Sequence, residues 1–526
     1  MHGDELAVVA LLVSAAGLLV AAVHTRIPYP ILLVVGSALL GFAPGAPDVE
    51  VDPDVILVLA LPPLLYTAAF FTDLHDFRRN IRPIGLLAVG LVVFTTVVVG
   101  VVAHAALGLD WAVAFTLGAI VSPTDPVAAT AIAGRLGAPR RYVSVVEGES
   151  LVNDATGLIA FKFAVAAVVS GTFSLLDAGA EFVLTAAGGI ALGIAVGIAV
   201  AAVRRRLEDA PTEITISFLT PYLAYLPAEA IGVSAVLAAV TSGIYLGWLA
   251  PQLISPQTRI ETYAFWRVVS FLINSALFVL IGLQLPAILD DLSGVSAGEL
   301  ALDSVVVVLT VLLVRFAWIF PSTYVPRRLF PRWYSSDPWP PMGLTLLVAW
   351  TGMRGAVSLA AALAIPETVD GGGAFPDRAL VVFLVYVVIL ATLLLQGLTL
   401  PSLIERLGLG AEEGEERREA LARIRAAEAA IERLDELAGE DWVREPSRVR
   451  MRGLYQFRVR RFGARFDDDD DGVLEEGSQA YQRLRREALQ AERDELLRLR
   501  GDGRISDEVM RRIERDLDLE DVRLDI

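Results

Sequence analysis

Five oxygen-bearing side chains between positions 147 and 154 could hold a cation or a proton on one helix. The segment reads Glu-Gly-Glu-Ser-Leu-Val-Asn-Asp. Glu147, Ser150 and Asp154 are spaced i, i+3 and i+7, so they lie along one helix face, and Glu149 and Asn153 form the adjoining stripe. Hard cations prefer oxygen ligands such as carboxylates, hydroxyls and carbonyls. The spacing therefore predicts a small cation site centred on Asp154 and Ser150.

Two interrupted helices could complete this site. Residues 121–126 read Val-Ser-Pro-Thr-Asp-Pro, and residues 350–355 read Trp-Thr-Gly-Met-Arg-Gly. Proline removes a backbone donor, and glycine weakens a helix. Half-helix N-termini carry partial positive charge and C-termini partial negative charge, so Asp125 can offset the first and Arg354 the second. Thr124 can offer its backbone carbonyl or its hydroxyl to the ion.

The carboxylate of Asp154 would be costly to keep charged away from water. Desolvation favours the neutral form, so this group can hold a cation or a proton, but not both comfortably. If Asp154 must be neutralised before its site can reorient, the cation and the proton move in opposite directions. The residues thus predict exchange of one ion for the other. A salt bridge between helices is the structural alternative for Asp154.

The remaining charged and polar groups have structural alternatives of their own. We expect Glu149 to pair with Arg315, and Asn153 to orient or hold the broken helix. Ser150 fits an ion ligand and fits equally a hydroxyl that bonds back to a carbonyl one turn earlier. Glu147 fits a funnel through which the ion enters, and it fits equally a structural group.

Composition places these residues in a membrane protein. The chain has 526 residues, of which 55% are hydrophobic and 20% charged, with a mean hydropathy of +0.58. This composition excludes a simple soluble enzyme, a disordered chain and a nucleic-acid binder, which would need a basic face. Cysteine is absent and the four histidines have no metal-ligand spacing. We expect no cofactor and no enzymatic activity.

The apolar runs predict thirteen transmembrane helices, since a helix needs about 20 apolar residues to cross a bilayer. The second and eighth runs are short. The predicted spans are residues 5–23, 29–43, 54–71, 83–107, 111–132, 143–170, 180–203, 213–226, 230–250, 262–289, 303–325, 341–364 and 378–402.

The distribution of basic residues predicts the orientation, because arginine collects in cytoplasmic loops. With the N-terminus outside and the C-terminus inside, 15 of the 19 basic residues in positions 1–404 fall on the inner side and only Arg378 on the outer side. The inner set is Arg26, Arg78, Arg79, Arg82, Arg135, Arg140, Arg141, Arg204, Arg205, Arg206, Arg259, Arg267, Arg327, Arg328 and Arg332.

The two interrupted spans are the fifth and the twelfth, and they run in opposite directions because seven positions separate them. This order indicates an inverted repeat of spans 1–6 and 8–13, and transporters bind substrate where such broken helices cross. The predicted fold is thus an all-α polytopic membrane protein with thirteen transmembrane helices, inverted repeats and two crossed discontinuous helices.

Residues 405–526 differ in composition and predict a charged, mostly helical cytoplasmic tail with a regulatory role. They carry 33 acidic and 25 basic residues. Residues 411–440 and 478–500 have helix-like composition. Between them, residues 448–465 are basic with aromatics, which fits a surface that lies on anionic lipid or an ordinary solvated surface. The aspartates at 467–471 are typical of a solvated linker.

Over residues 5–402 the chain resembles the monovalent cation/proton antiporters of the NhaP and sodium/proton exchanger (NHE) type. The motifs that carry the likeness are Ser-Pro-Thr-Asp-Pro-Val at 122–127, Glu-Gly-Glu-Ser-Leu-Val-Asn-Asp-Ala-Thr at 147–156, Leu-Pro-Pro-Leu-Leu at 61–65 and Gly-Met-Arg-Gly-Ala at 352–356. The resemblance implies a homodimer whose subunits have a six-helix core, spans 4–6 and 11–13, and a dimer-forming remainder.

The resemblance also implies roles for single residues. Asp154 would bind Na⁺ or a proton, with Thr124, Ser150 and Glu149 around it. Asn153 stands where electrogenic relatives carry a second aspartate, which implies electroneutral one-for-one exchange. The pairing of Glu149 with Arg315 and the position of Arg354 near Asp125 also follow the family pattern.

The leading expectation is a secondary antiporter in the cell membrane that exchanges Na⁺, or Li⁺, for H⁺. The close alternative is K⁺/H⁺ exchange gated by the tail. A sodium-coupled symporter for organic anions would need more polar groups around its substrate, and a cation channel would need a symmetric pore. The sequence does not identify a ligand or partner for the tail.

Overall fold

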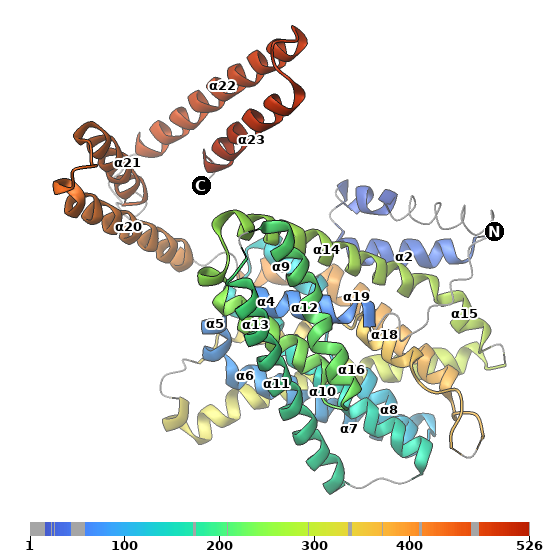
Figure 1. The fold of residues 1–526 in the computed structure, drawn as a ribbon. Coiled ribbons are helices and arrows are strands. Elements are labelled where there is room, and N and C mark those ends of the chain that lie inside the picture. The colour runs from blue at the N-terminus through green and yellow to red at the C-terminus, as the bar shows by residue number, and fades with distance from the viewer. Residues whose placement is uncertain are drawn as a thin grey trace. The chain divides into compact units, whose positions relative to one another are not determined.

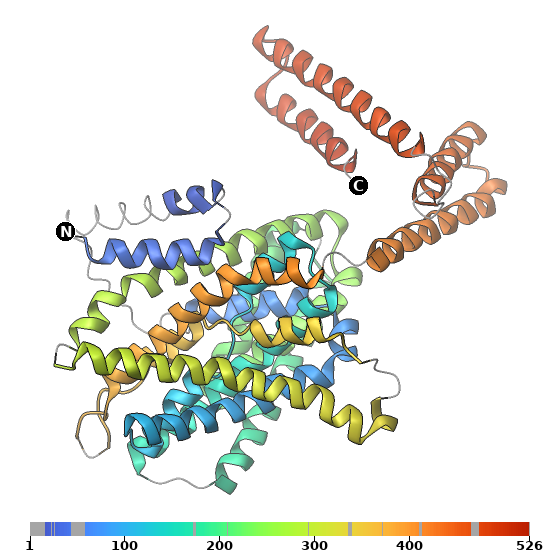
Figure 2. The ribbon, with the colours of Figure 1, turned by 180° about the vertical axis from the view of Figure 1, so that it is seen from behind.

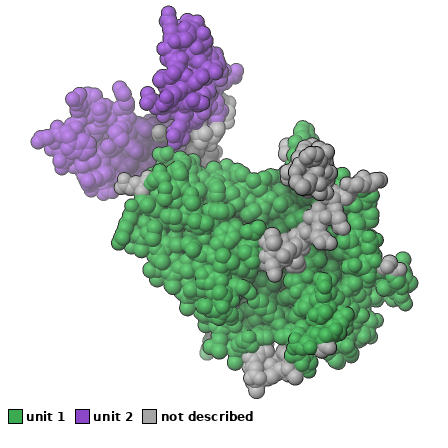
Figure 3. Space-filling view, turned by 45° about the vertical axis from the view of Figure 1, so that its right-hand side comes forward, with its two compact units in different colours: residues 1–410 green, residues 411–526 purple. Residues whose placement is uncertain are grey.

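A computed structural model describes most of the chain as two compact units, residues Met1–Gly410 and Ala411–Ile526 (Figure 3). The residues described are 16–22, 24–25, 27–43, 58–171, 175–207, 209–292, 294–334, 339–370, 372–409, 413–463 and 473–524. Arg26 and the aspartates at 467–471 therefore lie outside the described residues.

Unit 1 is helical, and within its described residues the only β-type pairing is a single bridge between Thr368 and Ala374. Seven of its described helical stretches are long and apolar enough to cross a membrane (Figure 1). They are Ile81–Leu107, Arg140–Ser170 (α10), Gly179–Arg204 within α11 (Leu175–Arg204), Ala235–Leu253 (α13), Pro256–Asp290, Ala297–Leu329 (α16) and Arg378–Leu407 (α19).

Two of these seven stretches are compound, and further helices complete the unit. Ile81–Leu107 consists of α6 (Ile81–Gly85), a π-helical segment (Leu86–Leu91) and α7 (Val92–Leu107), while Pro256–Asp290 consists of α14 (Pro256–Leu283) and α15 (Leu285–Asp290). The others are α2 (Tyr29–Gly41), α4 (Leu61–Phe71), α5 (Leu74–Arg79), α8 (Trp111–Ile120), α9 (Val127–Leu136), α12 (Ala210–Ala230), α17 (Met342–Trp350) and α18 (Ala356–Leu363).

These helices match the predicted spans closely, although the number of membrane crossings stays a prediction. Each predicted range from the second to the thirteenth contains a helix, and residues 16–22 of the first are helical. The short eighth range corresponds to α12, which is separate from α13. The tenth range begins too late, because α14 starts at Pro256, where Ser255 accepts a hydrogen bond from the backbone of Thr258.

The position of several arginines corrects the loop assignment. Arg259 and Arg267 lie inside α14 rather than in a loop. Arg140 and Arg141 form the first turn of α10, and Arg327 lies in the last turn of α16. The arginine bias is therefore largely a property of helix ends.

Both predicted interruptions are present as non-helical backbone. Residues 121–126 separate α8 from α9, and residues 351–355 separate α17 from α18. The two segments touch, since the backbone N–H of Asp125 donates to the carbonyl of Met353 at 2.8 Å. The fifth and twelfth predicted spans thus meet at their breaks.

Hydrophobic packing divides unit 1 into two groups of helices that meet at α10. One cluster joins α7–α9 with α16–α19 and also takes in residues of α2 and α14, which lie side by side (Figure 2). The other clusters join α4, α11, α12 and α13 and also take in Trp266 of α14. Val145 of α10 belongs to the first group, whereas Leu151 and Ala155 belong to the second. The segment 147–154 therefore lies where the groups meet.

Unit 2 contains four α-helices in its described residues: α20 (Glu413–Glu436), α21 (Glu445–Gly463), α22 (Val473–Gly501) and α23 (Asp507–Leu524). Leu489, Leu496 and Leu517 are buried where α22 packs on α23, and Arg493 pairs with Asp518 across that contact at 2.8 Å. The predicted helices at 411–440 and 478–500 correspond to α20 and α22. The basic stretch forms α21, and α23 was not predicted.

Candidate ion-binding site

A cavity of about 310 Å³ lies in unit 1 beside the break between α8 and α9. Its walls come from α4, α9, α10, α14, α18 and that break. Five of the residues that the sequence singled out line it: Thr124, Asp125, Glu147, Ser150 and Asp154. The other predicted residues, Asn153, Glu149, Arg315 and Arg354, are not among the lining residues.

Asp154 is a buried carboxylate of this cavity that has no partner among the described residues. It is only 8% exposed, and no described residue donates a hydrogen bond to it or forms an ion pair with it. The Ser150 hydroxyl, one helical turn away, also makes no hydrogen bond to the described residues. Burying an uncompensated carboxylate is costly, so either a proton or a cation at Asp154 would lower the free energy of this arrangement.

Glu149 is in the opposite situation on the same helix. Its two carboxylate oxygens accept hydrogen bonds from Arg315 of α16 at 2.6 and 2.9 Å. Both side chains are almost fully buried, at 1% and 2% exposure. Arg315 also donates from Nε to the carbonyl of Val348 at 3.2 Å. Such a two-pronged pair satisfies the charge of Glu149 within the protein.

A short chain of hydrogen bonds ties the broken helix to that ion pair. The Asn153 amide donates to the Thr124 hydroxyl at 2.8 Å, and the Thr124 hydroxyl donates to Glu149 at 3.1 Å. The hydroxyl proton of Thr124 is therefore used within the protein. The sequence suggested two groups of Thr124 as ion ligands, the hydroxyl and the backbone carbonyl. Of these, only the hydroxyl is engaged in hydrogen bonds to the described residues.

Charged side chains compensate the four helix ends at the crossing. Arg354 donates to the carbonyl of Val121, which follows α8, and to that of Gly352, which follows α17. Asp125 accepts from the backbone N–H of Val127 at the start of α9 at 2.9 Å. The Arg354 guanidinium group thus lies at two helix C-termini, where the backbone carries partial negative charge.

Asp125 also lies against the start of α18. A Cβ atom on Gly355, which precedes α18, would overlap the Asp125 carboxylate. Only glycine allows this close approach. One carboxylate therefore faces the N-terminal ends of α9 and α18, where the backbone carries partial positive charge.

Two supporting residues on α19 were missed by the sequence analysis. The Thr392 hydroxyl accepts from the backbone N–H of Arg354, and the Gln396 side chain accepts from that of Gly352, each at 3.1 Å. Both are buried, at 0% and 1% exposure. The available signal was a pair of polar side chains, at i and i+4, inside an otherwise apolar span.

Further polar residues of the cavity wall were missed as well. Ser270 and Asn274 of α14 line the cavity, together with Thr130 of α9 and Ser358 of α18. Asn274 donates to the backbone carbonyl of Ser270. Ser270 and Asn274 are spaced i, i+4 in an apolar helix, a pattern that could have drawn attention to them.

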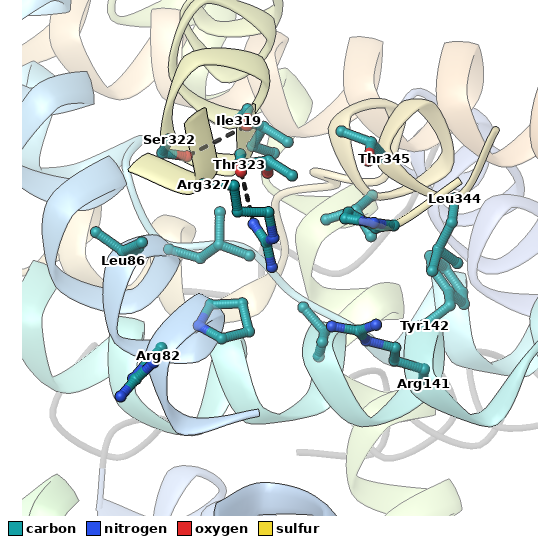
Figure 4. A pocket seen from close by; sticks show the side chains of 15 residues that line it. Arg82, Leu86, Arg141, Tyr142, Ile319, Ser322, Thr323, Arg327, Leu344 and Thr345 are labelled. Carbon is teal, nitrogen blue, oxygen red and sulfur yellow. Dashed lines mark hydrogen bonds between the residues drawn. The ribbon is translucent and has the colours of Figure 1, made fainter. Parts of the chain in front are cut away.

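A second, smaller cavity is lined by basic rather than acidic side chains. It measures about 70 Å³ and lies among α6, α10, α16 and α17. Arg82, Arg141 and Arg327 line it, and no carboxylate is among its lining residues. Figure 4 shows the side chains of Arg141 and Arg327 directed into it. The carboxylates that the sequence singled out line the larger cavity and not this one.

The wall of the larger cavity is rich in oxygen-bearing side chains. The carboxylates of Asp125, Glu147 and Asp154 line it, together with Thr124 and Ser150. Among the described residues no three histidine, cysteine, aspartate or glutamate side chains are grouped as metal ligands.

The Glu149–Arg315 pair generates a stability prediction. Arg315→Ala leaves Glu149 buried without its partner, which typically costs about 3–5 kcal/mol. Ser150→Ala removes a hydroxyl that bonds to no described residue, so we expect a loss of about 1 kcal/mol or less. Thermal unfolding of the purified protein should rank the two variants in that order.

An exposed ion pair on the same helix gives the control. Arg140 pairs with Asp73 and Asp76 and is 56% exposed, so Arg140→Ala should cost about 1 kcal/mol at most. Equal melting temperatures for Arg315→Ala and Arg140→Ala would contradict a stabilising role for the buried pair.

Comparison with known proteins identifies the family. A family model described as "Sodium/hydrogen exchanger, transmembrane" matches residues 8–406. The chain is 33% identical over 545 residues to the uncharacterised Na⁺/H⁺ exchanger YjcE of Escherichia coli strain K12, covering 97% of each protein. It is 35% identical over 505 residues to an uncharacterised Na⁺/H⁺ exchanger of Mycobacterium tuberculosis strain H37Rv, a match that covers 95% of this chain and 92% of the relative.

Two further matches bear on ion choice and on fold. A "Sodium, potassium, lithium and rubidium/H⁺ antiporter" of Bacillus subtilis strain 168 is 35% identical over 390 residues, which cover 72% of this chain and 58% of the relative. The antiporter MjNhaP1 of Methanocaldococcus jannaschii has a similar fold, with a TM-score of 0.58 at 18% identity over 77% of this chain and 99% of that one. The resemblance to NhaP-type antiporters is thus confirmed: this membrane-embedded chain belongs to the sodium/hydrogen exchanger family of cation/proton antiporters.

Proposed function

We propose that this protein exchanges Na⁺ for H⁺ across the cell membrane, with Asp154 as the group for which the two ions compete. The contrast between Asp154 and Glu149 carries this proposal. Both are buried carboxylates of α10, but Glu149 is neutralised by Arg315 whereas Asp154 has no partner among the described residues and lines a cavity.

Competition follows from the cost of a bare carboxylate at membrane depth. An uncompensated charge there is unfavourable, and either a proton or a cation relieves it. A proton bound to Asp154 removes the charge that attracts the cation, and a bound cation disfavours protonation. When the helices around the crossing rock to open the other side, an empty, charged site has the highest free energy. The cycle therefore proceeds only with one ion or the other bound.

The number of unpaired carboxylates supports one-for-one exchange. The position before Asp154 is Asn153, which is neutral and donates to Thr124. Asp125 also lines the cavity, but it faces the starts of α9 and α18 and so already has compensating dipoles. Glu147 lines the cavity too, but it is only partly buried, whereas Asp154 is 8% exposed. Asp154 is then the one buried carboxylate without a compensating group. It would carry one proton in one direction and one monovalent cation in the other, so that no net charge moves.

K⁺/H⁺ exchange is the second candidate. The relative from Bacillus subtilis is named for sodium, potassium, lithium and rubidium, so similar sequences are associated with several monovalent cations. Oxygen ligands alone do not select among these ions, since size selectivity depends on how rigidly the ligands are held. Transport assays must therefore compare Li⁺, Na⁺ and K⁺.

We further propose a homodimer with the N-terminus outside and the C-terminus in the cytoplasm. The arginine-rich helix ends support this orientation. The separate packing of α4, α11, α12 and α13 supports a division between an exchange core and a dimer-forming part.

Asp154→Asn should abolish exchange, because the amide can neither release a proton nor supply the charge that holds the cation. The measurement is dequenching of a pH-sensitive dye in proteoliposomes after addition of Li⁺, Na⁺ or K⁺. Clamping the voltage with an ionophore should leave the wild-type rate unchanged if exchange is electroneutral.

A matched variant controls for the amide substitution itself. Asp110→Asn makes the same change at an exposed aspartate that precedes α8, and it should exchange ions at the wild-type rate. Thermal unfolding verifies that both variants are folded. Normal exchange by folded Asp154→Asn would remove this residue from the proposed role.

We propose a regulatory role for unit 2 because it forms its own helical cluster outside the helices that build the ion cavity. Deletion of residues 411–526 removes unit 2 and leaves α19 intact to its end at Leu407. Exchange should persist, with a changed pH dependence or a changed concentration of cation for half-maximal rate. Complete loss of exchange in a folded truncated protein would instead make unit 2 part of the transport machinery.

A further inference from the structure

One face of α21 exposes apolar and arginine side chains together. Val449, Leu454 and Phe457 are 56%, 48% and 37% exposed, and Arg450 and Arg460 are also exposed. At 100° per residue these five side chains, with Gly453 between them, fall on one side of the helix. We call this set (Val449, Arg450, Gly453, Leu454, Phe457 and Arg460) the α21 stripe.

The α21 stripe points away from α20, the helix on which α21 packs. On the inner side, Arg448 and Arg452 pair with Asp435 of α20 at 3.3 and 2.5 Å. Arg423 of α20 lies over the ring of Phe462 at 5.2 Å. The inner arginines are therefore compensated within unit 2, whereas Arg450 and Arg460 form no ion pair with the described residues.

The charge of α21 has a single sign after its first residue. Between positions 446 and 463 there are six arginines and no aspartate or glutamate. The neighbouring helices differ, because on α22 and α23 arginines pair with acidic groups, such as Arg498 with Glu495 and Arg500 with Asp507. The α21 stripe thus combines uncompensated positive charge with exposed apolar surface.

This combination fits a membrane surface. Helices that lie in the headgroup region carry arginine or lysine together with phenylalanine and leucine, and anionic lipids attract basic segments close to the bilayer. The membrane is also within reach, since only residues 408–412 separate the end of α19 from the start of α20. A plain solvated face would gain nothing from exposing Val449, Leu454 and Phe457.

We propose that the α21 stripe docks on anionic lipid headgroups of the membrane that holds unit 1. Arg450 and Arg460 contact the lipid phosphates, while Leu454 and Phe457 enter the boundary between headgroups and acyl chains. This docking depends on the membrane location of the chain, which its family membership establishes, and not on which cation is exchanged. It gives unit 2 a defined ligand.

The experiment uses the full-length chain, which lacks cysteine and so accepts a single specific label. Gly453→Cys lies in the α21 stripe with open space around its Cβ position, and it carries an environment-sensitive fluorophore. The protein is reconstituted in vesicles of phosphatidylcholine alone or mixed with phosphatidylglycerol, each containing lipids brominated on the acyl chains as quenchers. We expect a blue shift and quenching only with phosphatidylglycerol, and reversal by high salt, which screens the attraction.

Charge-reversal variants test the arginines directly. Arg450→Glu with Arg460→Glu should abolish the lipid-dependent shift. Arg511→Glu with Arg512→Glu makes the same change of charge at two exposed positions of α23 and should leave the shift intact. None of these four side chains bonds to a described residue, so circular dichroism should report unchanged helix content.

Four results would overturn the proposal. The first is a fluorescence response that is identical in both lipid mixtures, and the second is a lipid-dependent response that persists in Arg450→Glu/Arg460→Glu. The third is a lipid-independent shift that disappears when the five aspartates at 467–471 are replaced by asparagine, which would mean that the α21 stripe binds the chain's own acidic run. The fourth is a shift that depends on the protein-to-lipid ratio, which would mean that the α21 stripe binds a second copy of the chain.

Discussion

The cost of charge inside the membrane-embedded unit governs the arrangement around the cavity. Arg354 lies at the carbonyl ends of α8 and α17, Asp125 faces the N-terminal ends of α9 and α18, and Glu149 is held by Arg315. Each of these charges is compensated within the protein. Asp154 differs, because no described residue compensates it and it lines the cavity. In the proposed function, an ion that enters the cavity provides this compensation.

Hydrogen bonds also join the compensated Glu149–Arg315 pair to the broken helix. Asn153 contacts Thr124 and Thr124 contacts Glu149, so the ion pair, the broken helix and α10 form one hydrogen-bonded network. α10 lies where the two packing groups of unit 1 meet, with Leu151 and Ala155 on one side and Val145 on the other. In the proposed alternating-access cycle, relative movement of the two groups would change the surroundings of Asp154.

Much of this site could be predicted from sequence, because membrane depth makes charges and helix breaks conspicuous. The prolines at 123 and 126 and the glycines at 352 and 355 indicated both breaks, and the spacing of Glu147, Ser150 and Asp154 indicated one helix face. The supporting side chains gave a weaker signal, namely pairs of polar residues at i and i+4 inside apolar helices. Thr392, Gln396, Ser270 and Asn274 are uncharged and distant in sequence, so only packing reveals that they reach the crossing or the cavity.

Proton release on cation binding tests the competition at Asp154 most directly. Purified protein in weakly buffered solution is mixed with Na⁺, or with K⁺ as the second candidate, while pH and heat of binding are recorded together. The account predicts release of protons when the cation binds, a cation affinity that falls as the pH falls, and neither effect in Asp154→Asn. Cation binding without proton release, or equal release by Asp154→Asn, would contradict it.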